Sequence, residues 1–408
     1  MIAADRQDAL DALLRQSDIA RLMDILNGDG AETRIVGGAV RNTLLSLPVS
    51  DIDLTTTLLP EETMARVKAA GLRSVPTGLS HGTVTVIVKG RPFEVTTLRE
   101  DIATDGRHAE VRFGRDFVQD ALRRDFTINA LSLDVAGTVH DYAGGLDDLG
   151  RRRVRFIGDA GQRIREDFLR ILRFFRFHAQ YAEGPLDREG YEASIALRAG
   201  LETLSRERVR QETMKLLTAS GAVAAIIALA EGGLMQVIIG GVDRRARFAR
   251  LVELAPDADA TLRLAALALA TAEDVPRLRE RLRLTNQEET RLSALAVLVE
   301  RFHDHAVIGE AEAKELIYTA GTQGFTDLSR LLAAGERDAL STVATLAERW
   351  SAPAMPFTGG DVLALGVPKG PGVGKVLKET ERRWIADGFP ADPLRHKALL
   401  VEALAAQE

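Results

Sequence analysis

The spacing of hydrophobic residues changes about a third of the way along the chain. Before about residue 150, short β-branched runs are separated by glycine turns, whereas from about residue 164 leucine and alanine recur at helical spacing. The segments 83–89 and 92–98 flank a Gly-Arg turn and predict a β-hairpin, and 131–135 predicts another strand. Helices are predicted over 2–27 and 60–70. The chain is therefore predicted to have an α+β fold, in which a head with a small mixed β-sheet precedes an all-α remainder.

Glycine- and proline-rich breaks divide this chain further. They predict a head over residues 1–150, a helical neck over 151–220, a helical body over 221–350 and a helical tail over 351–408. With 408 residues, the chain is long enough for several domains with cores of their own.

One stretch near the N-terminus combines several chemical signals. Residues 34–57 read RIVGGAVRNTLLSLPVSDIDLTTT, a pattern typical of strand, glycine turn, short helix and strand. Because residues i and i+2 of a strand share a face, Asp51 and Asp53 are expected to project together while Ile52 and Leu54 face the core. Adjacent carboxylates repel each other and favour a bound cation, and all-oxygen ligands suit Mg²⁺.

The glycines of this stretch point to a second ligand. Gly37 and Gly38 allow the backbone to approach a ligand closely. The N–H groups of the following helix, with Arg41 in its first turn, offer an anion site. A phosphate cradle beside metal-binding carboxylates describes a site for a nucleoside triphosphate.

Charge and composition narrow the possible partners. The net charge is −6, so nucleic-acid binding requires a local basic patch, and residues 151–176 supply nine arginines against three acids. The absence of cysteine excludes disulfides, thiolate metal sites and a cysteine nucleophile. The N-terminal residues lack the apolar segment of a secretory signal, and no run approaches the roughly 20 apolar residues that span a bilayer. We therefore expect a cytoplasmic protein.

Three later segments also combine arginines with carboxylates. They are RRDFTINA at 123–130, REDFLRILRFFRF at 165–177 and SRERVRQETMKLL at 205–217. Together with GGAVR and DIDLTT, and in this order, they resemble the motifs of the class II (bacterial-type) tRNA nucleotidyltransferase and poly(A) polymerase family. The resemblance covers about residues 34–217. It implies that residues 1–150 form a nucleotidyltransferase head.

This resemblance assigns roles to individual residues. It implies that Asp51 and Asp53 bind the catalytic Mg²⁺ and that Glu94, on the neighbouring strand, completes the acidic cluster. It implies that Asp167 and Arg170, which the i, i+3 spacing places on one helix face, touch the edge of the incoming base. The residues expected to bind the nucleotide are Gly37, Gly38, Arg41, Arg124, Asp125, Asp167, Arg170, Arg173 and Arg176.

The individual contacts differ in kind. Arg124 is expected to bind phosphate oxygens, and Asp125 is expected to accept hydrogen bonds from ribose hydroxyls. Arg173 and Arg176 follow at steps of three, so they wind around the helix, and they are expected to reach the triphosphate or to hold the helix in place.

Within the family, the chain is most like a CCA-adding enzyme, because residues 81–84 read HGTV. The resemblance implies template-independent addition of C, C and A from CTP and ATP to the 3′ end of tRNA, with release of pyrophosphate. The helical part is then expected to hold the tRNA acceptor arm. Poly(A) polymerase activity, addition of CC or A alone, adenylation of a small molecule, and a non-catalytic RNA-binding role all stay open, and so does the oligomeric state.

Two residues depart from the family's motifs, and two later segments suggest other kinds of site. Asn42 and Ser46 replace an Asp and a Gly that are usual in the family. Residues 370–375, GPGVGK, hint at a P-loop, but Lys369 stands where the first glycine is required. Residues 303–305, HDH, hint at a metal-dependent phosphohydrolase, although the chain has only seven histidines. Residues 99–122 are predicted to form a polar loop beside the site.

Overall fold

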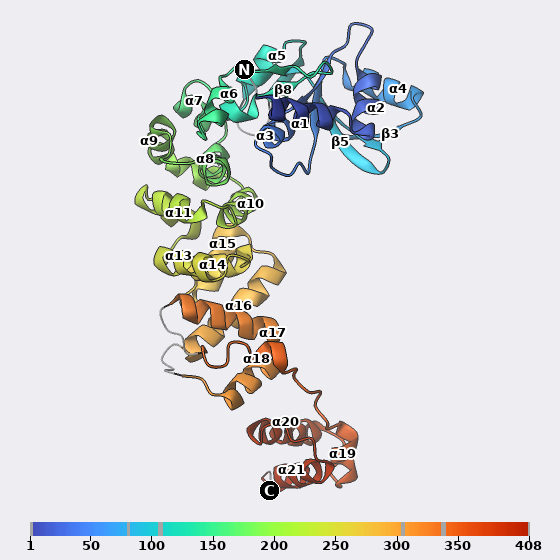
Figure 1. The fold of residues 1–408 in the computed structure, drawn as a ribbon. Coiled ribbons are helices and arrows are strands. Elements are labelled where there is room, and N and C mark those ends of the chain that lie inside the picture. The colour runs from blue at the N-terminus through green and yellow to red at the C-terminus, as the bar shows by residue number, and fades with distance from the viewer. Residues whose placement is uncertain (1–2, 80–81, 105–108, 303–306, 336–339, 407–408) are drawn as a thin grey trace. The chain divides into compact units, whose positions relative to one another are not determined.

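A computed structural model describes residues 3–79, 82–104, 109–302, 307–335 and 340–406, and the side chains of residues 100–112 are not described. The chain forms two compact units, Met1–Ile238 and Ile239–Glu408, which are considered separately (Figure 1). The finer division into head, neck, body and tail stays a prediction. In the part of the chain that the structure describes, none of the helices has the length and hydrophobicity needed to cross a bilayer.

A seven-stranded mixed sheet organises the first part of unit 1. Its strand order is β3-β4-β5-β2-β1-β8-β9. The pair β2–β5 is parallel and the other neighbouring pairs are antiparallel, which confirms the predicted α+β head with a mixed sheet. The strands are β1 (Thr33–Val36), β2 (Asp53–Thr56), β3 (Arg73–Gly78), β4 (Thr83–Val88), β5 (Arg91–Thr97), β8 (Ser132–Leu133) and β9 (Val139–His140).

The hairpin predicted from alternation is β4–β5. Val84, Val86 and Val88 are fully buried, while Thr85 and Ile87 between them are partly exposed, so a period of two buries one face of β4. The strand predicted over 131–135 is shorter than expected. It ends at Leu133 because the Asp134 carboxylate accepts the N–H groups of Ala136 and Thr138 and closes a turn.

Four helices accompany the sheet, and α2, α3 and α4 pack against it or against each other (Figure 1). They are α1 (Ala4–Leu14), α2 (Ser17–Leu26), α3 (Gly38–Leu44) and α4 (Pro60–Ala69). The single helix predicted over 2–27 is wrong, because Gln16 has extended backbone (ψ 128°) and separates α1 from α2. The helix predicted from Pro60 is confirmed as α4.

The polar loop predicted over 99–122 is also wrong. β6 (Arg99–Thr104) and β7 (Ala109–Phe113) form a two-stranded sheet, and α5 (Phe117–Leu122) follows. Asp116 begins α5 by accepting the N–H groups of Val118 and Gln119. Residues 105–108 and 80–81, which include part of the HGTV turn, lie outside the described residues.

The rest of unit 1 is helical, as predicted. Phe126 and Phe156 pack against Phe174 of α8, with ring centroids 6.3 and 5.4 Å from that of Phe174. This aromatic core fixes the RRDFTINA segment against α8. The helices are α6 (Gly145–Gly150), α7 (Ala160–Glu166), α8 (Leu169–Tyr181), α9 (Arg188–Ala196), α10 (Arg206–Leu217), α11 (Ala222–Glu231) and α12 (Leu234–Ile239), with 3₁₀ turns at Thr127–Asn129 and Arg198–Thr203.

Unit 2 contains helices and no strand within its described residues. The P-loop-like GPGVGK segment is the start of α20, with Pro371 in its first turn. The HDH segment at 303–305 lies outside the described residues. The helices are α13 (Arg245–Leu254), α14 (Ala260–Ala268), α15 (Asp274–Leu282), α16 (Asn286–Phe302), α17 (Glu310–Ala334), α18 (Leu346–Arg349), α19 (Gly359–Ala364), α20 (Pro371–Ala386) and α21 (Pro393–Ala405).

Candidate active site

The carboxylates predicted to bind metal lie at one end of two adjacent strands. Asp53 begins β2 and is in register with Glu94 of β5. Asp51 precedes the strand instead of lying within it, yet Asp51 and Asp53 are exposed while Ile52 and Leu54 are buried. The predicted alternation of faces is therefore confirmed, although the strand starts two residues later than expected.

The electrostatics of this cluster favour a cation. Restricted hydration raises the pKa of the Asp53 carboxyl, the charges of Glu94 and Asp51 raise it further, and Arg124 opposes them. Within the described residues, no group of three or more histidine, aspartate or glutamate side chains is arranged to hold a metal ion. The donors suited to a metal are thus the two exposed aspartates, a set that fits a hydrated oxygen-binding ion such as Mg²⁺.

Arg124 lies against the glycine turn. Gly37 has φ +63°, and a Cβ at that position would lie 3.2 Å from Nη1 of Arg124. The guanidinium donates to Oδ2 of buried Asp120 (Nη2 to Oδ2, 3.1 Å). Burial acts to raise the pKa of Asp120, but the charges of Arg124 and Arg123 hold it below its ordinary value. Asp120 therefore fixes the direction of the Arg124 side chain beside the turn.

Arg41 is in a different environment from the one expected. It is buried, and it donates to the Asn129 side chain, to the Tyr181 hydroxyl (2.8 Å) and to Oδ1 of Asn42 (2.8 Å from Nη2). Burial lowers the pKa of Arg41. Its guanidinium carbon lies 4.0 Å from the Tyr181 ring centroid. Arg41 thus joins α3 to α8.

Asn42 both accepts and donates a hydrogen bond through its side chain. Its Oδ1 accepts from Arg41, and its Nδ2 donates to the carbonyl oxygen of Pro48 at 2.9 Å. An amide satisfies both contacts, whereas the aspartate that is usual in the family accepts hydrogen bonds but cannot donate one when ionised. Asn42 therefore links Arg41 to the segment that leads into Asp51.

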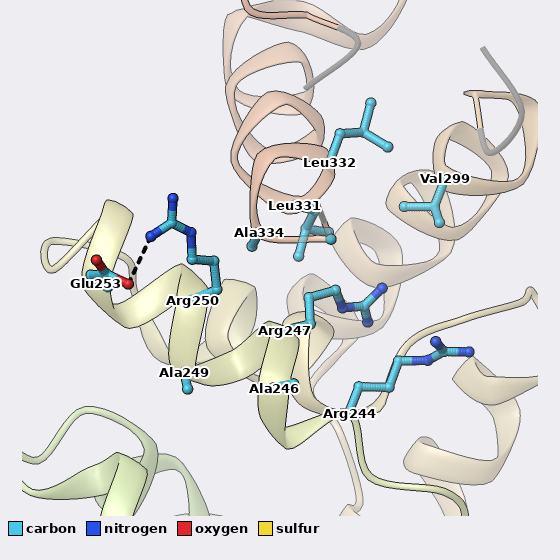
Figure 2. Close-up of a pocket in the computed structure, with 11 residues that line it drawn as sticks. Arg244, Ala246, Arg247, Ala249, Arg250, Glu253, Val299, Leu331, Leu332 and Ala334 are labelled. Atoms are coloured by element: carbon cyan, nitrogen blue, oxygen red, sulfur yellow. Dashed lines mark hydrogen bonds and ion pairs between the residues drawn. The ribbon is translucent and has the colours of Figure 1, made fainter. Parts of the chain in front are cut away.

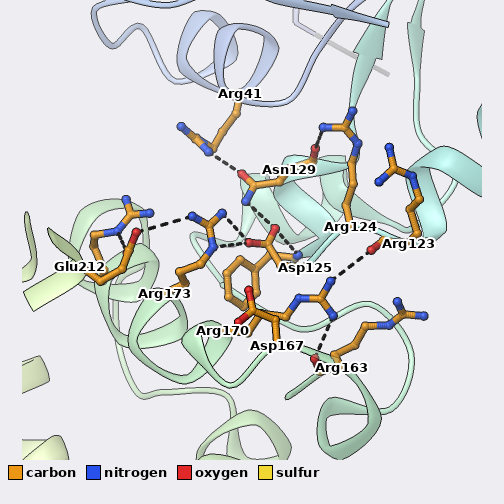
Figure 3. Close-up of polar contacts among 12 residues, drawn as sticks. Arg41, Arg123, Arg124, Asp125, Asn129, Arg163, Asp167, Arg170, Arg173 and Glu212 are labelled. Atoms are coloured by element: carbon orange, nitrogen blue, oxygen red, sulfur yellow. Dashed lines mark hydrogen bonds and ion pairs between the residues drawn. The ribbon is translucent and has the colours of Figure 1, made fainter. Parts of the chain in front are cut away.

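Asp125 is buried with its carboxylate fully engaged (Figure 3). Oδ1 accepts from the Phe126 N–H and from Nδ2 of Asn129, each at 2.9 Å, and Oδ2 accepts from Nε (2.8 Å) and Nη2 (2.6 Å) of Arg173. Burial acts to raise the pKa of Asp125, but the Arg173 charge and these hydrogen bonds hold it below its ordinary value. The geometry supports a bracing role and leaves no free oxygen pair for ribose.

The arginines of α8 extend this brace. Arg173 also lies 3.7 Å from Glu212 of α10 (Figure 3). Arg176 donates to the other oxygen of the same glutamate. Glu212 and Arg176 are both buried. Of the two roles predicted for Arg173 and Arg176, these contacts correspond to holding the helix in place.

The helix predicted to carry both Asp167 and Arg170 is interrupted. α7 ends at Glu166 and α8 begins at Leu169, and Asp167 between them has extended backbone (φ −157°, ψ 106°). The prediction that the two residues share one helix face is therefore wrong. The Arg170 N–H still donates to the Asp167 carbonyl oxygen at 3.0 Å, so the two residues remain within one turn.

Comparison with known proteins agrees with this geometry. Residues 33–155 match the poly A polymerase head domain, and residues 186–244 match a domain described as "Probable RNA and SrmB- binding site of polymerase A". The chain is 36% identical over 380 residues to CCA tRNA nucleotidyltransferase 1, mitochondrial, of Danio rerio, covering 89% of this chain and 85% of that protein. It belongs to the CCA tRNA nucleotidyltransferase family.

Other relatives support the assignment. The CCA-adding enzyme of Streptococcus sanguinis is 40% identical over 238 residues, covering 58% of each chain. The crystal structure of the Bacillus stearothermophilus CCA-adding enzyme in complex with CTP has a TM-score of 0.74 at 28% identity, covering 96% of this chain and 98% of that one. The Thermotoga maritima CCA-adding enzyme complexed with tRNA has the same fold, with a TM-score of 0.70 at 20% identity and full coverage of both chains.

The sequence alone did not predict most of the side chains that hold the predicted site residues in place. Asn129 and Arg208 lie inside recognised motifs, but nothing in their spacing shows which side chains they contact. Tyr181 carried no signal, because its contact with Arg41 spans 140 residues. The one usable signal was Asp120, which stands four residues before Arg124, the spacing at which side chains meet on a helix.

A hollow of about 740 Å³ in unit 2 contains none of the predicted site residues (Figure 2). Arg244, Arg247 and Arg250 line one side and Leu331 lies opposite. Burial lowers the pKa of Arg247 to about 10, which leaves it charged at neutral pH. Arg247 donates to carbonyl oxygens at the end of α14, so its charge closes a helix terminus.

Proposed function

We propose that this protein is a CCA-adding enzyme that adds C, C and A from CTP and ATP to the 3′ end of tRNA and releases pyrophosphate. The observation that carries the proposal is the exposed pair Asp53 and Glu94, in register across β2 and β5, with Asp51 alongside and Arg124 against the Gly37 turn. The names of the most similar proteins, and the CTP, ATP and tRNA named with related structures, support the choice of substrates.

The carboxylates and Arg124 divide the chemistry between them. Asp51 and Asp53 would hold Mg²⁺, which when bound makes a 3′-hydroxyl more acidic and neutralises triphosphate charge. Arg124, already oriented by Asp120, binds phosphate oxygens as a forked donor. The turn at Gly37 admits the phosphates close to the backbone. Glu94 orients the attacking hydroxyl beside the aspartates.

Base choice falls to Asp167 and Arg170 in this proposal. Cytosine and adenine both carry an exocyclic amino group, whereas uracil and guanine carry a carbonyl at the corresponding position. A carboxylate accepts from the amino group, and a guanidinium donates to an adjacent ring acceptor. A protein site of this kind specifies C and A without a nucleic-acid template. Arg41, Asp125, Arg173 and Arg176 support the site by bracing α3, the RRDFTINA segment, α8 and α10.

The helical remainder would hold the tRNA acceptor arm by shape and backbone contacts, because every tRNA has to be accepted. A cytoplasmic location is part of the same proposal. The vertebrate relatives are named mitochondrial, so the compartment is best tested by fractionation.

The deciding experiment uses the full chain, tRNA that lacks CCA, Mg²⁺ and labelled CTP or ATP. Ordered growth by C, C and A is the expected result. Growth by C and C alone, or by A alone on tRNA that ends in CC, identifies a partial enzyme. A long run of A identifies a poly(A) polymerase, and a lack of incorporation into any RNA contradicts the proposal.

A further inference from the structure

We propose that Arg208 of α10 is a positioning residue for base selection, which holds the Asp167 carboxylate in the orientation that reads the incoming base. The inference rests on the proposed function. It concerns a residue of α10, 41 residues along the sequence from Asp167, which lies between α7 and α8.

The backbone alone does not fix the Asp167 side chain. Asp167 lies between α7 and α8 with extended backbone, so it lacks the helical neighbours that restrict a side chain within a helix. One oxygen, Oδ1, accepts the Leu169 N–H at 3.1 Å and begins α8. That single bond leaves the carboxylate free to turn about it.

Arg208 supplies the second point of attachment. Its Nη2 donates to Oδ2 of Asp167 at 2.7 Å. With one donor on each oxygen, the plane of the carboxylate is set, and about two of its four lone-pair positions stay available. Those positions can accept the amino group of cytosine or adenine, and they repel the carbonyl of uracil or guanine.

Arg170 is held by other partners. It donates to the Glu166 carboxylate, to the Arg163 carbonyl oxygen at 2.8 Å and to the Arg123 carbonyl oxygen at 3.4 Å. Arg170, the donor proposed to read the base, is thus held by α7 and by the end of α5. Asp167, the proposed acceptor, is held by α10. Removal of Arg208 is therefore expected to disturb Asp167 and to leave Arg170 in place.

The position of α10 suits this role. Glu212 follows Arg208 by four residues, so both lie on one face of the helix. Glu212 binds the buried Arg176 of α8 and anchors that face, and Arg208 extends from it to the start of α8. The side chains of Arg208 and Asp167 are 41% and 28% exposed, so this ion pair adds little to folding stability. A change in base choice after the removal of Arg208 would therefore not be explained by unfolding.

The test compares Arg208→Ala and Arg208→Lys with Arg206→Ala, a change of the same type in the same turn of α10. Steady-state kcat and KM are measured for CTP, ATP, UTP and GTP on tRNA that lacks CCA. We expect Arg208→Ala to lower the preference for CTP over UTP and for ATP over GTP by about tenfold, mainly through KM. Arg208→Lys should restore part of the preference, and Arg206→Ala should leave it unchanged.

The possible failures are distinguishable. If wild-type protein adds no nucleotide to tRNA, the proposed function is wrong. If wild-type protein selects C and A and Arg208→Ala keeps the same ratios, or loses kcat equally for all four nucleotides, only the role of Arg208 is wrong. Should Arg208→Ala melt at a lower temperature than Arg206→Ala, Arg208→Lys decides. A lysine variant with full stability that restores part of the preference supports positioning, and one with full stability and the same ratios as the alanine variant refutes it.

Discussion

Replacing Asp125 with asparagine tests the brace between the RRDFTINA segment and α8. The Asp125 carboxylate is buried and accepts two hydrogen bonds from Arg173, one from Asn129 and one from the Phe126 N–H. The amide of asparagine keeps the shape but directs an NH₂ group at one of these donors. It also leaves Arg173 without its main counter-charge.

The expected cost follows from these contacts. Breaking a buried ion pair by removing one partner costs about 3–5 kcal/mol. Glu212, 3.7 Å from Arg173, offsets part of the loss, so we expect about 3 kcal/mol for Asp125→Asn. The matched control is Asp147→Asn, since the Asp147–Arg151 pair is exposed on both sides and should change stability by less than about 0.5 kcal/mol.

The assay uses the positions of the two tryptophans. Both tryptophans, Trp350 and Trp384, belong to unit 2, so their fluorescence reports that unit, whereas far-UV circular dichroism reports both. In urea, Asp125→Asn should move the transition seen by circular dichroism to lower concentration and leave the fluorescence transition in place. A loss below about 1 kcal/mol, or an equal shift in both signals, would refute the reasoning.

The pH dependence of this variant gives an independent check. The pKa of Asp125 is held below its ordinary value in the folded state, so its stabilisation is present above the unfolded pKa, about 4, and is lost as pH falls through the lower folded value. Wild-type unit 1 should therefore lose stability below about pH 4 more steeply than Asp125→Asn does. Parallel curves for the two proteins would contradict the lowered pKa.

Three further predictions concern other contacts. Asp53→Asn should abolish incorporation of CTP and ATP without lowering the melting temperature, because it removes a charge that Glu94 and Asp51 oppose; retained activity would refute its role. Asn42→Ala should melt lower than Asn42→Asp, because the aspartate still accepts from Arg41 and loses only the bond to Pro48; the reverse order would contradict this account. Arg247→Met should cost unit 2 about 2–4 kcal/mol, measured by tryptophan fluorescence in urea, because it removes the donor to the carbonyl oxygens of Ala266 and Leu269; an unchanged midpoint would refute that role.

Local sequence patterns determined the elements on which the predicted catalytic residues lie. Alternation of valine and threonine predicted β4, and the period of two around Ile52 separated the exposed aspartates from the core. A glycine at position 37 was needed because the chain has a positive φ there. These features depend on neighbours within a few residues, so the sequence was sufficient to predict them.

The break at Asp167 shows where local reasoning falls short. The segment REDFLRILRFFRF has helical spacing and contains neither glycine nor proline, so it predicts one helix. Aspartate is nevertheless a favoured residue at helix starts, and the Asp167 carboxylate begins α8. The sequence therefore contained a signal for a helix start at Asp167, but this signal was weaker than the helical spacing of the hydrophobic residues around it.

Tertiary structure decided which charged side chain meets which. Arg41 contacts Tyr181 across 140 residues, Asp125 contacts Arg173 across 48, and Asp167 contacts Arg208 across 41. The chain has 53 lysines and arginines and 59 acidic residues, so composition allows many pairings of similar energy. The packing of α3, α8 and α10 around the aromatic core selects among them, because an ion pair forms only where backbone packing brings its partners within reach. The sequence by itself thus determined the acidic pair and the glycine turn, and only the fold decided which partners hold Arg41, Arg173 and Arg176, three of the predicted nucleotide-binding arginines.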